Sequence, residues 1–102
     1  MNHYTAEYVT ELLINKDDLV SYARRESDDH MSAYIDAVDD LKIILTAFHK
    51  LPEKHQIRIN IYLFSGLTQI EMAEALNTKQ PNVKRNFLRS IEKLLDLINV
   101  GS

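Results

Sequence analysis

The chain has no cysteine and no tryptophan, and only two glycines and two prolines among its 102 residues. Without cysteine, disulfide bonds, thiolate metal ligands and thiol catalysis are excluded. The scarcity of glycine and proline leaves little material for β-hairpin turns and favours helices joined by short connections. A chain of this length forms one compact domain with a modest core. We therefore predict an all-α fold of five or six helices.

Long apolar runs are also missing. None approaches the ~20 residues that a membrane-spanning helix requires, and the N-terminal sequence MNHYTAEYVTE lacks the basic-then-apolar pattern of a secretory signal. We expect a cytoplasmic protein that does not associate with membranes.

Patterns typical of catalytic and metal sites are missing as well. There is no glycine-rich phosphate loop, and the acidic pairs Asp28-Asp29 and Asp39-Asp40 have no nucleophile or pocket-forming pattern beside them. No two histidines have the i, i+3 or i+4 spacing of helical metal ligands, so we expect all four on the surface. They are His3, His30, His49 and His55. We predict no enzymatic activity, no metal and no cofactor.

Positive charge is unevenly distributed. The net charge is −3, with −5 in residues 1–51 and +2 in residues 52–102. The stretch NTKQPNVKRNFLRS contains four basic residues and no carboxylate; they are Lys79, Lys84, Arg85 and Arg89. A short chain can show such a split by chance. The alternative, which we favour, is that the two halves have different partners.

The longest regular apolar pattern lies in the N-terminal half. Six residues recur at spacings of three and four, as on one face of a helix. They are Met31, Tyr34, Val38, Leu41, Leu45 and Phe48. The breadth of the stripe favours a helix packed on its own core over a self-associating seam, although a regular seam also suits self-association. Our hypothesis for residues 1–50 is a helical interaction region, most simply a homodimer platform.

Residues 52–66 carry the start and stop signals of a helix. Pro52 suits the first helical position, and Gly66 can supply the left-handed conformation that often ends a helix. We expect this helix to be central because it is apolar almost all round, with one face made by Ile57, Ile61 and Phe64.

Two further helices follow, separated by only three or four residues. Thr68 and Glu71 have the spacing of a capping box, and the second helix runs from about Gln80 to Ile98. Ala73 is small enough for the helices to cross closely. On a helical wheel the basic residues of the second helix face away from its apolar side. This arrangement predicts a C-terminal helix-turn-helix.

The sequence LPEKHQIRINIYLFSGLTQIEMAEALNTKQPNVKRNFLRSIEKLLDLI, Leu51 to Ile98, resembles region four of bacterial sigma factors and related phage regulators. It shares the Leu-Pro-Glu opening, the Gly-Leu-Thr link, the Ala-x-x-Leu helix and a basic second helix. It departs at Asn77-Thr78, where the family has glycine and an aliphatic residue, although Asn tolerates the left-handed turn. Residues 1–50 do not resemble the promoter-melting region, so the chain is not a complete sigma factor.

The resemblance implies a DNA-binding surface at the start of the last helix. Carried over by position, Gln80, Lys84 and Arg85 would read base edges in the major groove. Four others would contact phosphates; they are Thr68, Lys79, Asn82 and Arg89.

Three functions remain open on the sequence. The first is a sequence-specific transcription regulator of the phage or prophage type that binds double-stranded DNA. The second is a DNA-packaging recognition subunit on an oligomeric scaffold. The third is a protein-interaction module that binds RNA polymerase or another regulator, with which an acidic N-terminal half is compatible.

Overall fold

The computed structural model describes residues 4–24 and 32–100, and this part of the chain contains six helices and no strand. The helices are α1 (Ala6–Ile14), α2 (Lys16–Arg24), α3 (Ser32–Lys50), α4 (Glu53–Phe64), α5 (Gln69–Ala75) and α6 (Gln80–Val100). The prediction of an all-α fold is confirmed. None of these six helices is both long and apolar enough to cross a membrane.

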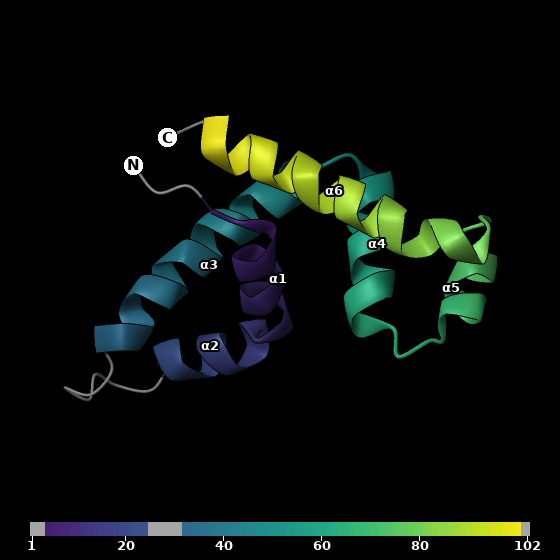
Figure 1. Ribbon diagram of the computed structural model, residues 1–102. Helices are drawn as coiled ribbons and strands as arrows, with labels where there is room; N and C mark the ends of the chain where they lie inside the picture. The colour runs from purple at the N-terminus through teal and green to yellow at the C-terminus, as the bar shows by residue number, and fades with distance from the viewer. Residues whose placement is uncertain (1–3, 25–31, 101–102) are drawn as a thin grey trace.

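Helix α6 connects the two ends of an elongated molecule that measures 48 × 29 × 19 Å. Figure 1 shows α1, α2 and α3 on one side, α4 and α5 on the other, and α6 running along both. The contacts of α6 with α1, α3, α4 and α5 agree with this view. A single long helix therefore holds the N-terminal and C-terminal halves together.

The main hydrophobic core takes residues from both halves of the chain. Val9 of α1, Ile44 of α3 and Ile59 of α4 are fully buried in it. Ile91 and Leu94 of α6 are also fully buried. The regions 1–50 and 51–98 thus share one core.

The apolar seam predicted for residues 31–48 is largely core, which corrects the hypothesis that it is a dimer surface. Leu41 and Phe48 are only 2% and 8% exposed within the single chain. Val38 and Leu45 are half-buried and pack against the same cluster. Met31 and the side chain of Tyr34 lie outside the described part. Helix α3 packs against α1, α2 and α6 of the same chain, so the buried part of the seam is already covered.

Helix α4 is less central than its composition predicts. Ile59 is buried, whereas Ile57 and Phe64 are 43% and 41% exposed. The reason is that α4 packs mainly on α6, which covers one side of it.

The ammonium of Lys16 lies 4.5 Å from the centre of the exposed Phe64 ring. Pro52 is the N-cap of this helix and not its first residue.

A carboxylate held by two tyrosines joins α1 to α3. The hydroxyl of Tyr4 donates to Oδ1 of Asp40 at 2.7 Å, and that of Tyr8 donates to Oδ2 at 2.5 Å. The two rings stack with their centroids 5.9 Å apart. The hydrogen bond to Asp40 raises the pKa of Tyr4 to about 12. Burial, followed by its hydrogen bond to Asp40, raises the pKa of Tyr8 to about 12.

We expect these tyrosines to make the protein sensitive to alkali. Their pKa values are higher in the folded chain than the usual 10, so their contribution to stability is complete below pH 10 and is lost as the pH rises towards 12. Urea unfolding at pH 9 and pH 11.5 measures the loss in free energy. A double variant, Tyr4→Phe and Tyr8→Phe, should lose less over this interval. An equal loss in both proteins would contradict the assignment.

Candidate nucleic-acid interface

Local hydrogen bonds fix the short helix α5 and the turn that follows it. The capping box is confirmed, because the N–H of Glu71 donates to Oγ1 of Thr68 at 3.2 Å and the N–H of Thr68 donates to the Glu71 carboxylate at 2.9 Å. Asn77 has a left-handed φ of 52°, as its place in the turn predicts. The N–H of Thr78 then donates to the carbonyl of Ala73 at 2.9 Å. The turn is therefore held without the usual glycine.

A small second core fixes α5 against α6. Met72 and Ala73 of α5 meet Val83 of α6, and all three are buried. Tyr62 of α4 packs against this cluster and stacks on Phe87 of the main core, with ring centroids 4.1 Å apart. The start of α6 is thus supported from two helices, so its outer face has a defined orientation.

Most of the predicted contact residues are exposed at the start of α6. Asn82 is half-buried and accepts a hydrogen bond from the Arg85 guanidinium. In the part of the chain that the structure describes, the basic side chains of this stretch form no ion pair with a carboxylate. The exposed predicted residues are Thr68, Lys79, Gln80, Lys84, Arg85 and Arg89. The ammonium and guanidinium groups among them are accessible to an external anion.

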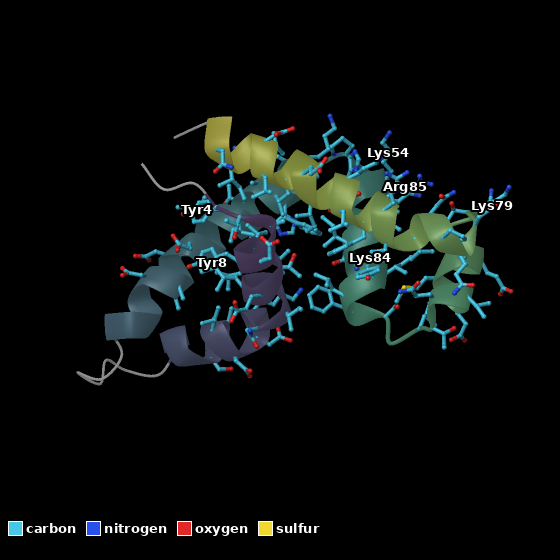
Figure 2. All side chains as sticks on the ribbon, viewed as in Figure 1. Tyr4, Tyr8, Lys54, Lys79, Lys84 and Arg85 are labelled. Atoms are coloured by element: carbon cyan, nitrogen blue, oxygen red, sulfur yellow. The ribbon has the colours of Figure 1, made fainter. Side chains whose placement is uncertain are left out.

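Lys84, Arg85 and Arg89 surround a shallow depression on α6. Pro81, the half-exposed Leu88 and the acidic Glu92 complete its lining. In Figure 2 the Arg85 label lies above α6 and the Lys84 label below it, and the two positions are about 100° apart around the helix. The predicted base-reading residues therefore lie at two edges of one face.

Two basic residues of α4, missed by the sequence analysis, lie near the buried His55 at the contact of α4 with α6. Lys54 lies on the same side of α6 as Arg85 (Figure 2). Arg58 follows Lys54 by one helical turn, so the two lie on the same side of α4. Both residues, and Lys93 of α6, are close enough to His55 to affect its pKa. The i, i+4 spacing of Lys54 and Arg58 was the available signal, but only the packing of α4 on α6 shows where they point.

His55 corrects the prediction that all the histidines lie on the surface. It is buried, and its Nδ1 is 2.9 Å from Oγ of the fully buried Ser90, which ties α4 to α6. His49 is exposed, and the two remaining histidines lie outside the described residues. Burial lowers the pKa of His55 below its usual 6.5, and the surrounding positive charges lower it further. The neutral imidazole is thus the favoured form at neutral pH. Its contact with Ser90 holds α4 against α6, which carries the basic surface.

We expect the protein to lose stability in mild acid because of His55. Its pKa is lower in the folded than in the unfolded chain, so its contribution to stability is complete well above pH 6.5 and is lost as the pH falls below that value. Urea unfolding at pH 7.5 and pH 5 measures the change. His55→Gln should reduce the dependence on pH, whereas the control His49→Gln should leave it unchanged. The same dependence in all three proteins would contradict this role.

The arrangement can bind an extended anion, and it offers little else. Within residues 4–24 and 32–100, no three histidine, aspartate or glutamate side chains lie together as a metal site. What the surface presents is positive charge with amide and hydroxyl donors, which is the chemistry that phosphate backbones and base edges require.

Comparison of the chain with protein-family models, with curated proteins and with solved structures found no match.

Proposed function

We propose that the chain is a sequence-specific transcription regulator that binds double-stranded DNA. In this proposal α5 and α6 form a helix-turn-helix, and the first half of α6 enters the major groove. The observation that carries it is the solvent-facing basic surface of α6, which contains no carboxylate before Glu92. Support from α4 and α5 gives this surface the rigidity that base reading needs.

The residues divide into two roles by position and chemistry. Arg85, Lys84 and Gln80 face the groove, where Arg and Lys suit guanine and Gln suits adenine. The outer residues contact phosphates, which fix register and carry no sequence information. These are Thr68, Lys79, Asn82, Arg89, Lys54 and Arg58.

Fluorescence anisotropy with labelled duplexes tests the proposal. The affinity should fall steeply with salt, because each neutralised phosphate releases counterions; four such contacts give a log–log slope of about −3.6. Lys54→Ala should reduce the slope by about 1 and weaken binding to all sequences alike. Selection from random duplexes should then enrich one short sequence.

Two results would contradict the proposal. Absence of duplex binding at low salt would leave a protein-interaction module, with RNA polymerase or another regulator as its partner. Binding without enrichment of any sequence would leave a DNA-binding protein that does not read bases.

A further inference from the structure

The outward face of α3 carries an ordered charge pattern that the DNA-binding proposal does not use. Along one stripe of this face, from the start to the end of the helix, the exposed residues are first acidic, then apolar or neutral, then basic, and the exposed Lys42 and His49 lie beside the stripe. The residues of the stripe are Asp36, Asp39, Ile43, Thr46 and Lys50. All five lie on the side of α3 opposite Leu41 and Phe48, which face the core.

The spacing makes this face complementary to itself. Asp36 and Lys50 are each seven residues from Ile43, so each lies about 10.5 Å from it along the axis and within about 20° of the same face. An antiparallel second copy related by a twofold axis at Ile43 would bring its Lys50 opposite Asp36, and its Asp36 opposite Lys50. A twofold contact requires this kind of reciprocal match.

The centre of the face offers apolar area for such a contact. Ile43 and Leu97 are 48% and 43% exposed and line one shallow hollow between α3 and α6. Thr46, Ala47 and Ile98 line the same hollow, with Lys42 and Lys50 at its edge. Two large aliphatic side chains in one hollow would lose contact with water on pairing, which is the main favourable term in association.

We propose that this face, defined by Asp36, Asp39, Ile43, Thr46 and Lys50 with Leu97, binds the same face of a second copy in antiparallel orientation. The partner is a second copy of the chain because, in antiparallel orientation, it presents a basic, an apolar and an acidic residue opposite the acidic, apolar and basic residues of this face. This dimer does not depend on DNA binding. If both proposals hold, it would supply two symmetry-related copies of α6.

Sedimentation equilibrium of the full chain tests the pairing. The chain should dimerise at micromolar concentration, and Ile43→Glu should raise the dissociation constant at least about tenfold, because two carboxylates would meet at the axis. The control Ile57→Glu, at a similarly exposed isoleucine on α4, should leave it unchanged. A monomeric wild-type chain, or a dimer unaffected by Ile43→Glu, would overturn the proposal.

Charge reversal tests the antiparallel geometry with exposed residues that should not affect folding. Asp36→Lys and Lys50→Glu should each place like charges opposite one another and weaken self-association. An equimolar mixture of these two variants should form a heterodimer, because every facing pair is then opposite in sign. A mixture that associates no better than either variant alone would overturn the proposed pairing.

The two proposals fail separately. A monomer that still selects a DNA sequence would remove the dimer and leave the regulator. A dimer that responds to Ile43→Glu and binds no duplex would remove the regulator and leave the dimer.

Discussion

Replacement of Arg85 by alanine should weaken binding to a cognate duplex by about 1–3 kcal/mol and relax the base preference at one position. The guanidinium is exposed on the outer face of α6 and is oriented by its hydrogen bond with Asn82. It can therefore offer two parallel donors to a guanine edge with little loss of side-chain freedom. Anisotropy titrations with the selected duplex and with a random duplex measure the effect.

The control removes the same charge elsewhere. Lys16→Ala is on α2, where the ammonium lies over the Phe64 ring and away from the start of α6, and it should leave the affinity for DNA nearly unchanged. An equal loss on cognate and random duplexes would assign Arg85 to a phosphate. No loss on either would contradict a role for this side chain in binding.

Substitution of Ala73 by leucine should destabilise the fold by about 1–3 kcal/mol, because it overpacks a closed helix crossing. Ala73 is 7% exposed and lies between α5 and α6 in the same cluster as Met72 and Val83. Its carbonyl also accepts the hydrogen bond from Thr78 that closes the turn. Thermal and urea unfolding measure the loss.

Ala75→Leu provides a matched comparison for this prediction. Ala75 is in the same short helix but is exposed, so an added leucine there should change stability by no more than ~0.5 kcal/mol. If Ala73→Leu were as stable as the wild type, the close crossing of α5 and α6 would be contradicted, and with it the support for the helix-turn-helix.

Local features were predictable from the sequence because their causes are local. The capping box at Thr68 and Glu71 depends on side chains reaching backbone groups within three residues. The left-handed residues Gly66 and Asn77 depend on what each side chain permits at its own position. The buried face of α6 follows from helical periodicity.

Features that depend on which helix covers which face were not predictable. A histidine between a lysine and a glutamine is typical of a surface position, yet the packing of α4 on α6 buries His55 against Ser90. The same packing leaves Ile57 and Phe64 exposed. It also brings Lys93 of α6 near Lys54 and Arg58 around His55, which no pattern within α4 alone could show.

The seam in α3 illustrates a different limit. Its periodicity correctly predicts a helix with one apolar face, but a core face and a coiled-coil seam share that periodicity. The structure assigns Leu41 and Phe48 to the core of the same chain. The surface that we propose for self-association lies on the opposite side of the helix, around Ile43, where the sequence shows only one isolated apolar residue among charges.

An NMR titration of the isotope-labelled chain with a duplex it selects tests most directly whether the first half of α6 binds DNA. The largest shifts in backbone amide signals should fall between Lys79 and Arg89, with smaller shifts around Lys54 and Arg58. Signals from α2, which lies away from the start of α6, should move little (Figure 1). Large shifts confined to α1–α3, with α6 unchanged, would contradict the proposed DNA-binding surface.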